Sequence, residues 1–283
     1  MEVSEAALRV LSGLLEARTG QQLSPARRWR VSGALQPLLR EHGLAGADAL
    51  AARLAAGVEP ALADETVEAL LNNETFFYRD RQLFELLLGP ALDRLAHARR
   101  DRRRLALWCA GCSTGQEAYS LAMHFLDDPA RWGDWRIDIR ATDVSAAAIA
   151  QAASGVYSQF EVQRGLPVLR MMRWFAEYPG GAWRASATLR GAVRFSVGNL
   201  LGGPPPGGPF DVLLCRNVLL YFGDSTRQAA FAALAGAAAP DAVLMLGAGE
   251  TASGHTGAFV PDPACRGLYV AAPATVAGGR AAS

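Results

Sequence analysis

The chain has too little of several features that would set its function class at once. Its 283 residues include only four cysteines, too few for a disulfide scaffold at this length. The formal net charge is only +1, so the whole molecule has no field suited to nucleic acid or an anionic membrane surface. No apolar run reaches the roughly 18–20 residues of a membrane span, and the first residues lack the pattern of a secretion signal. We therefore expect a cytoplasmic protein with reduced thiols, no nucleic-acid partner and no membrane insertion.

Two of the cysteines, Cys109 and Cys112, have the spacing of metal or redox ligands within WCAGCSTGQEAYSLA. A structural zinc site needs four ligands, and neither a second such pair nor a histidine at ligand spacing accompanies them. We therefore expect no metal. A redox pair remains an alternative, because such pairs typically lie between a strand and a helix. The Gly-Lys-Ser/Thr of phosphate-binding loops and the strict GxGxxG of dinucleotide loops are both missing, which weakens those two readings.

The first 88 residues have helical periodicity throughout. Three segments place apolar residues on one helix face, and each ends at a glycine that fits a C-cap: ALRVLSGLLEARTG, VSGALQPLLREHG and ADALAARLAAG. This pattern predicts a small all-helical N-terminal domain at 1–88. The run HARRDRRR follows, and such runs are most often solvated connectors, a patch for an acidic partner being the alternative. We therefore expect a basic linker at 89–104.

From 105 to 272, short apolar runs alternate with helical segments, which is typical of a parallel sheet covered by helices on both faces. Aromatic and β-branched residues flank a Pro-Gly-Gly turn signal, which predicts an antiparallel β-hairpin inserted at about 174–190. Residues 273–283 have the composition of a disordered tail. The predicted fold class is α/β, with a Rossmann-like domain and a small antiparallel β insert after the helical domain.

The turn after the first of these strands is the place where we expect a ligand. The segment Gly111 to Gly115 joins a strand to a helix, and its glycines let the backbone approach a ligand closely because they lack a Cβ. The next strand ends at Asp143, where open α/β sheets typically place an acid that binds ribose hydroxyls. Glu117 lies in the first turn of the helix and faces the same crevice. These residues predict a pocket for a nucleoside cofactor.

Six segments, in this order and at these spacings, resemble the CheR-type protein-glutamate methyltransferases of bacterial chemotaxis, which use S-adenosylmethionine. They are NNETFFYRD (72–80), CSTGQEAYSLA (112–122), ATDVS (141–145), SGVYS (154–158), VGNLL (197–201) and FDVLLCRNVLLYF (210–222). The resemblance covers nearly the whole chain, including the helical domain and the insert. It implies a class I methyltransferase domain at 105–272, S-adenosylmethionine as cofactor, S-adenosylhomocysteine as product and no metal. The CxxC spacing is then incidental.

The resemblance also implies roles for individual residues near the N-terminal side of the site. Asn73, Thr75 and Arg79 match positions that contact the cofactor, and Arg79 is a catalytic candidate because it can position cofactor or substrate. Glu117 matches an acid beside the methionine or ribose part. Asp143 matches the acid that binds the ribose.

Further roles follow for residues in the later segments. Asn199 and Leu200 match positions that flank the adenine, and Arg216 and Asn217 match positions at a strand end below the methyl donor. Tyr221 matches a tyrosine near the transferred methyl group and is the second catalytic candidate.

The implied reaction is methyl transfer to the side-chain carboxylate of glutamates in methyl-accepting chemotaxis receptors, which gives a methyl ester. A glutamate with a pKa of about 4.3 is almost fully ionised at pH 7, so the reaction requires no general base. A monomer is the default expectation, since nothing in the sequence sets the oligomeric state. The resemblance implies that the chain is recruited to membrane receptor arrays through the receptors' cytoplasmic helical region. Arg27 and Arg30 are candidates for docking an acidic receptor helix, and a solvated basic face is the alternative.

Three other readings remain. The first is a nucleic-acid or small-molecule methyltransferase, although CRNVLLYF differs from the Asn/Asp-Pro-Pro-Tyr strand end that favours adenine and amide methylation. The second is a non-catalytic module that binds S-adenosylmethionine as a signal. The third is a dinucleotide oxidoreductase, which the missing GxGxxG weakens.

Overall fold

The structure is a computed structural model that describes residues 3–24, 27–57 and 59–272. The disordered tail predicted at 273–283 lies outside these residues. Within the described ranges, no helix is both long enough and apolar enough to cross a membrane.

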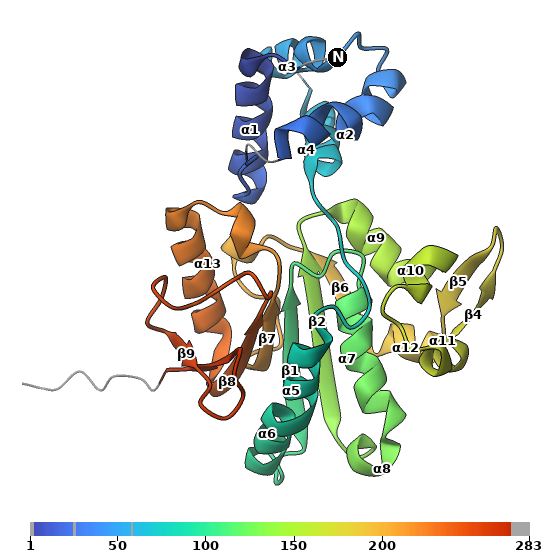
Figure 1. Cartoon of the computed structure of the whole chain (residues 1–283), viewed down its shortest axis with the longest axis vertical. Coiled ribbons are helices and arrows are strands. Elements are labelled where there is room, and N and C mark those ends of the chain that lie inside the picture. The colour runs from blue at the N-terminus through green and yellow to red at the C-terminus, as the bar shows by residue number, and fades with distance from the viewer. Residues whose placement is uncertain (1–2, 25–26, 58, 273–283) are drawn as a thin grey trace, which may run out of the picture.

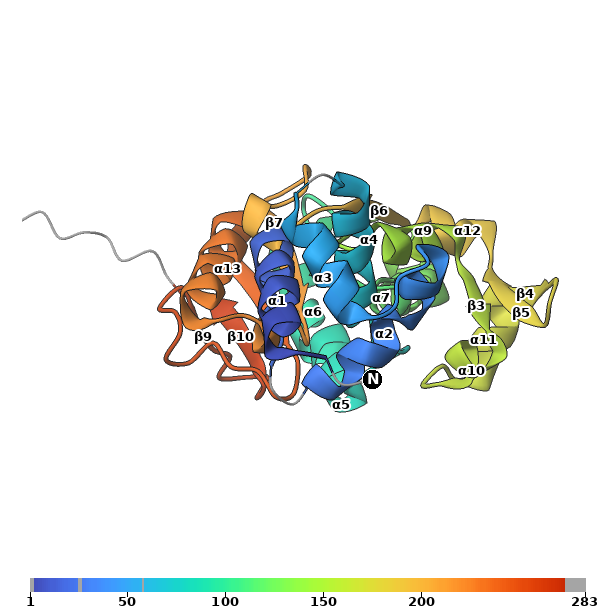
Figure 2. The same ribbon diagram turned by 90° about the horizontal axis from the view of Figure 1, so that it is seen from above.

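A bundle of four helices forms the N-terminal part of the chain and lies above one end of the central sheet (Figures 1 and 2). Ser4 caps the first helix through its hydroxyl, and Gly20 ends it in the left-handed conformation at φ 79°. The bundle has its own core, in which Leu11, Leu35 and Leu50 are fully buried. Its helices are α1 (Glu5–Thr19), α2 (Arg28–Glu41), α3 (Ala47–Ala55) and α4 (Pro60–Leu70).

The break between the two parts of the chain lies earlier than the predicted linker at 89–104. The core of the bundle ends at Leu70, and residues 71–80 run to the larger part without helix or strand. The next elements pack on the sheet, and their Leu92 and Leu95 lie in the core of the larger part. These elements are α5 (Arg81–Leu86), the π-helical turn η2 (Leu87–Ala91) and α6 (Leu92–Ala98).

The basic run was expected to be a solvated linker, but Arg99 within it belongs to the folded core. This residue is buried rather than solvated: its Nε donates to Asp211 Oδ1 at 2.8 Å and its Nη1 to Asp241 Oδ2 at 2.7 Å. The hydrogen bonds to Asp241 and Asp211 hold the pKa of Arg99 above its ordinary value, against the effect of burial. The other oxygen of Asp211 accepts from the backbone N–H of Ala106 at 2.8 Å. Arg99, early in the run, therefore anchors the end of α6 to three strands.

A seven-stranded sheet forms the centre of the larger part. Its first five strands in spatial order are parallel, and the last two are antiparallel to their neighbours. The order reverses between β1 and β7, because the chain moves from β1 outward on one side and from β7 outward on the other. In spatial order the strands are β6 (Val193–Val197), β2 (Arg136–Asp143), β1 (Arg104–Ala110), β7 (Phe210–Cys215), β8 (Ala238–Leu246), β10 (Leu268–Ala271) and β9 (Phe259–Pro261).

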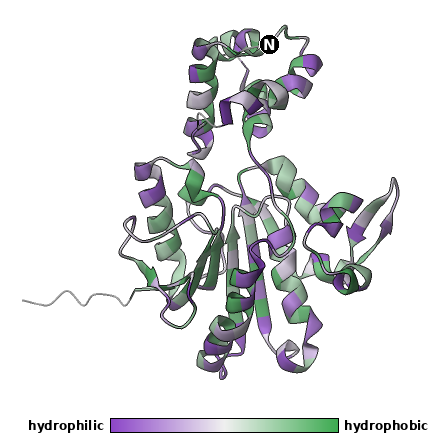
Figure 3. Cartoon of the chain, in the orientation of Figure 1, coloured by the Kyte–Doolittle hydropathy of each residue, from purple (hydrophilic) through white to green (hydrophobic). Residues whose placement is uncertain are grey.

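Helices cover both faces of this sheet, which confirms the predicted fold class. In β1, Leu105 and Leu107 join the core under α5, α6, α7 (Gln116–Asp127) and α9 (Ala146–Ser154), whereas Ala106 and Trp108 join the core under α13 (Asp224–Ala237). Strands buried on both faces are apolar at every position, which is why they appear as continuous apolar runs. Figure 3 shows the central strands mostly in green for this reason.

The antiparallel insert is present and has one strand more than predicted. β4 (Phe175–Tyr178) and β5 (Ala182–Ala185) form the hairpin, with Gly180 and Gly181 at positive φ in the turn. The additional strand, β3 (Val156–Ser158), pairs with β5. The remaining short helices are α8 (Pro129–Trp132), α10 (Gln159–Gln163), α11 (Val168–Trp174) and α12 (Ala187–Gly191), and the 3-10 turns are η3 (Leu200–Gly202) and η4 (Leu219–Tyr221).

The Arg99 anchor gives a prediction about stability. Replacing Arg99 with Met leaves the buried carboxylate of Asp211 without its cation, which should lower the free energy of unfolding by about 3–5 kcal/mol. Arg100→Met is the matched control, because Arg100 belongs to the same run but is exposed, and it should change stability by less than about 0.5 kcal/mol. Urea denaturation of both variants measures the difference. Equal stabilities would contradict the anchoring role.

Candidate active site

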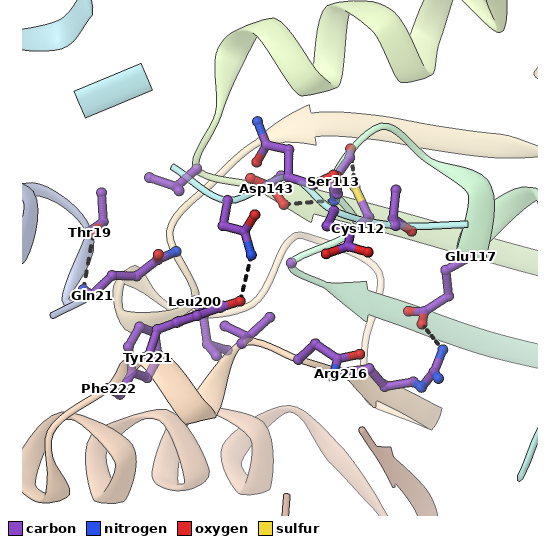
Figure 4. Close-up of a pocket in the computed structure, with 18 of the residues that line it drawn as sticks. Thr19, Gln21, Cys112, Ser113, Glu117, Asp143, Leu200, Arg216, Tyr221 and Phe222 are labelled. Carbon is purple, nitrogen blue, oxygen red and sulfur yellow. Dashed lines mark hydrogen bonds and ion pairs between the residues drawn. The ribbon is translucent and has the colours of Figure 1, made fainter. Parts of the chain in front are cut away.

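A cavity opens where several parallel strands end and residues 72–79 cross over them (Figure 4). Its empty volume is about 760 Å³, open solvent included. This is the point at which the strand order reverses, where open α/β sheets bind their ligands. All ten residues that the resemblance named for cofactor binding and catalysis line it: Asn73, Thr75, Arg79, Glu117, Asp143, Asn199, Leu200, Arg216, Asn217 and Tyr221.

The floor of the cavity is the tight loop after β1. The backbone N–H groups of Gly111 and Cys112 donate to Thr142 O at 2.8 and 3.0 Å, which joins this loop to the end of β2. Gly111 is at φ 78°, and a Cβ there would lie 2.3 Å from a methyl carbon of Val218. Only glycine fits such a position. Ser113 Oγ donates to Asn73 O at 2.7 Å and so attaches the segment that crosses the strands.

Asp143 ends β2 as a buried carboxylate whose two oxygens each accept one backbone hydrogen bond. Oδ2 accepts from Ser113 N at 2.7 Å, and Oδ1 accepts from Ser145 N at 2.9 Å. Burial raises the pKa of this carboxyl group, and the hydrogen bonds offset part of the rise. A carboxylate oxygen has two lone pairs, so each oxygen can accept one more donor, such as a ribose hydroxyl.

Arg216 follows β7 and forms the central ion-pair cluster of the site. Its side chain is only 2% exposed, and it donates to Glu117 Oε2, Asp80 Oδ2 and Arg79 O, each at 2.7 Å. Burial raises the pKa of Glu117, and Arg216 opposes that rise. Burial acts to lower the pKa of Arg216, but the carboxylates of Glu117 and Asp80 raise it by more, so the net shift of the pKa is upward. Arg216 therefore stays charged and pairs with Glu117 at the cavity wall, where Figure 4 marks the interaction by a dashed line.

Glu250 shapes the loop after Arg216, and the sequence analysis missed it. Its carboxylate accepts from the backbone N–H groups of Asn217 at 2.7 Å, Val218 at 3.0 Å and Gly247 at 2.8 Å. Asn217 is at φ 58°, a left-handed conformation that asparagine tolerates better than most residues. The acid lies just after β8, and its position at a strand end was the available signal.

The N-terminal part of the chain holds Tyr221. Its hydroxyl accepts from Asn72 Nδ2 at 2.7 Å, and its carbonyl accepts from Gln22 N at 2.7 Å. The guanidinium of Arg27 lies over its ring, 4.7 Å from the centroid. Figure 4 shows Tyr221 and Phe222 beside Gln21 and Thr19, which also line the cavity and which the sequence analysis missed.

The two arginines predicted to dock a receptor helix have different surroundings. Arg27 is half-buried, donates to Leu70 O at 3.1 Å and has its pKa lowered by burial. It therefore supports Tyr221 rather than forming part of an open basic face. Arg30 is exposed beside Trp29, whose side chain is also exposed. Of the two predicted docking arginines, Arg30 is therefore the exposed one.

The cavity offers hydrogen-bond acceptors that the described residues do not use. Gln21 Oε1 and Asn217 Oδ1 are both buried in its wall without a hydrogen-bond partner among the described residues. Together with the carboxylates of Glu117 and Asp143, they suit a ligand that is cationic and rich in donors. S-adenosylmethionine has such a character, with an ammonium group, a sulfonium, ribose hydroxyls and an adenine amine.

The sequence offers four cysteines for a metal or redox site. The described residues contain no group of three or more His, Cys, Asp or Glu side chains that could hold a metal ion. The cysteines at 109, 112, 215 and 265 are buried and free of disulfides. Burial raises the pKa of the Cys109 and Cys112 thiols, the opposite of what a reactive thiolate needs.

The comparison with known proteins agrees with this geometry. The family model described as "CheR methyltransferase, SAM binding domain" matches residues 73–264. The chain belongs to the CheR family. It is 31% identical over 259 residues to the chemotaxis protein methyltransferase of Vibrio parahaemolyticus, covering 91% of this chain and 93% of that one. It is 32% identical over 253 residues to chemotaxis protein methyltransferase 1 of Pseudomonas aeruginosa, covering 88% and 92%.

A solved structure is similar to this chain at lower sequence identity. It is the magnesium protoporphyrin IX methyltransferase ChlM of Synechocystis with bound SAH, at 17% identity and a TM-score of 0.31, covering 66% of this chain and 59% of that one.

This CheR-family chain should lose cofactor affinity when charged residues that line the cavity are altered. We expect Asp143→Ala and Arg79→Ala to weaken S-adenosylhomocysteine binding about tenfold or more, because each removes a charged group from the cavity wall. Asp224→Ala, which alters an exposed acid on α13, is the control and should bind normally. Isothermal titration calorimetry measures all three, and unchanged affinity in both site variants would overturn the assignment.

Proposed function

We propose that this CheR-family chain transfers the methyl group of S-adenosylmethionine to the side-chain carboxylate of glutamates in chemotaxis receptors. The products are a glutamate methyl ester and S-adenosylhomocysteine. The single observation that supports this most is the convergence of all ten family-matched residues on one cavity at the strand-order reversal. The names of the relatives point the same way, because both are chemotaxis protein methyltransferases.

The residues that line the cavity suit a methyl transfer that needs binding and alignment of the reactants but no general base. When bound, S-adenosylmethionine supplies a methyl group on a sulfonium, which a carboxylate can displace. A glutamate substrate is already ionised at pH 7, so no general base is required. Accordingly, no histidine is among the described residues that line the cavity. Alignment of the reacting groups can supply roughly 7–11 kcal/mol of the barrier.

Each residue of the site then has a binding or positioning role. Glu117, held by Arg216, binds the ammonium group, and Asp143 binds the ribose hydroxyls. Tyr221, held by Asn72, and Arg79, whose Nη1 donates to Glu74 O at 2.9 Å, line the cavity near the substrate. Strong stabilisation of the attacking carboxylate would slow the reaction, because its charge disappears in the transition state. Arg79 therefore orients the reactants rather than acting as an acid.

The same proposal includes the partner. The chain acts as a monomer in the cytoplasm and is recruited to receptor arrays through the cytoplasmic helical region of the receptors. The exposed Arg30 on α2 lies on the bundle side of the cavity and carries the charge that an acidic receptor helix would meet.

The experiment is methyl transfer from methyl-labelled S-adenosylmethionine to membranes that contain the organism's chemoreceptors, followed by mild base. We expect base to release the label as volatile methanol, because a carboxyl ester hydrolyses under these conditions. Asp143→Ala serves as the control and should give little label. Base-stable label would indicate methylation of nitrogen or carbon, and absence of label with normal cofactor binding would indicate a non-catalytic module.

A further inference from the structure

A second, polar groove lies on the other side of the segment that closes the cofactor cavity. Residues 73–75 line both the groove and the cavity. The opposite wall of the groove comes from α9 and α10, which lie side by side in Figure 1, and from Arg164 just after α10. Residues 73–75 would separate a peptide lying in this groove from the cavity in which methyl transfer is proposed.

Of the described residues that line this groove, Arg164 is the one with a cationic side chain. Its guanidinium stacks on Phe76, 4.4 Å from the ring centroid, and the Arg79 guanidinium lies 5.5 Å from the same ring. The backbone beside it is fixed as well, because a Cβ on Gly165 would lie 2.0 Å from Phe77 O. Arg164 therefore keeps its place by stacking and backbone packing, whether or not its charge is paired.

The present partner of Arg164 is a carboxylate of the same chain. Glu74 Oε1 accepts from Arg164 Nη2 at 2.8 Å, and the two side chains are 49% and 39% exposed. The pKa of Glu74 is lowered, first by this hydrogen bond and also by the charges of Arg164, Arg79 and Arg30. A pair so exposed contributes little to stability, so another carboxylate can replace Glu74 at small cost.

The other acid on this groove does not compete for Arg164. Glu161 Oε2 accepts from the backbone N–H and the hydroxyl of Ser158, and its Oε1 accepts from Gln151 Nε2 at 3.1 Å. Both oxygens are thus engaged in capping α10 and bracing α9. Among the residues that the structure describes, Glu74 alone pairs with the Arg164 guanidinium.

We propose that Arg164 binds a second carboxylate of the acidic protein substrate, one near the glutamate that is methylated, and that Glu74 holds this position until the substrate arrives. The inference rests on the proposed function, since it presupposes a carboxylate-bearing substrate at the neighbouring cavity. The bound carboxylate is not the nucleophile, because Arg164 lines the groove and is absent from the lining of the cavity. A guanidinium suits this role because its planar fork matches a carboxylate.

The test is steady-state methylation of a soluble cytoplasmic chemoreceptor fragment at saturating S-adenosylmethionine. Arg164→Ala should raise the KM for the fragment about tenfold with kcat little changed, because a binding contact is lost. Arg164→Lys should raise KM less, about threefold, since it keeps the charge without the fork. Glu74→Gln should lower KM about threefold by removing the internal competitor, and this gain should vanish in the double variant with Arg164→Ala.

Arg81→Ala is the matched control, because Arg81 also forms an exposed pair, with Glu85, away from the groove. Its KM should equal that of the unaltered chain. Unchanged KM in Arg164→Ala, or a raised KM in Glu74→Gln, would overturn this inference while leaving the proposed function intact. Absence of methyl transfer by the unaltered chain would overturn both. Arg164→Gln provides the same comparison if the alanine variant does not fold, as judged by its thermal unfolding.

Discussion

The ion pairs of Arg216 are the constraint on which the rest of the site depends. One buried guanidinium joins the end of β7 to Glu117 in the first turn of α7 and to Asp80 at the end of the segment that leaves the bundle. In a buried cluster, loss of one partner costs about 3–5 kcal/mol because the remaining charge is uncompensated. Asp80 and Tyr78 are both at positive φ, an uncommon conformation that these surroundings impose. Arg216 thus determines how residues 72–79 cross the strand ends and complete the cavity.

The helical bundle adds a second set of contacts to the same region. Glu68 of α4 accepts from the Ser145 hydroxyl at 2.7 Å and from Ala146 N at 2.6 Å, and so caps α9 from the other part of the chain. Asn199 donates to Arg18 O at 3.2 Å. Each of these polar contacts is modest alone, but together they hold the loops after β2 and β6. The cofactor pocket is therefore built by both parts of the chain together.

The sequence predicted the features that depend on local pattern. The continuous apolar runs of β1 and β7, and the glycine cap at Gly20, follow from residue types within a few positions, and the structure confirms them. The six family segments predicted which residues meet at one cavity, although not how they contact one another. Their individual roles in binding and catalysis stay predictions.

The features that the sequence did not reveal depend on distant partners. Arg99 is buried because it pairs with Asp211 and Asp241, which lie more than 100 residues away along the chain. Nothing in the local sequence distinguishes it from the other arginines of its run. Glu250 has its role because a loop 33 residues earlier presents backbone N–H groups to it. β3 is three residues long, too short for an alternating pattern, and exists because β5 offers an edge.

The most direct test of this account is hydrogen exchange combined with S-adenosylhomocysteine calorimetry on Arg216→Lys. Lysine keeps a charge beside Glu117, but it cannot bridge that carboxylate, Asp80 and the carbonyl of Arg79 at once. The account predicts faster amide exchange in residues 72–80 and an affinity about tenfold weaker. Unchanged exchange in this segment together with unchanged affinity would contradict the claim that Arg216 assembles the pocket.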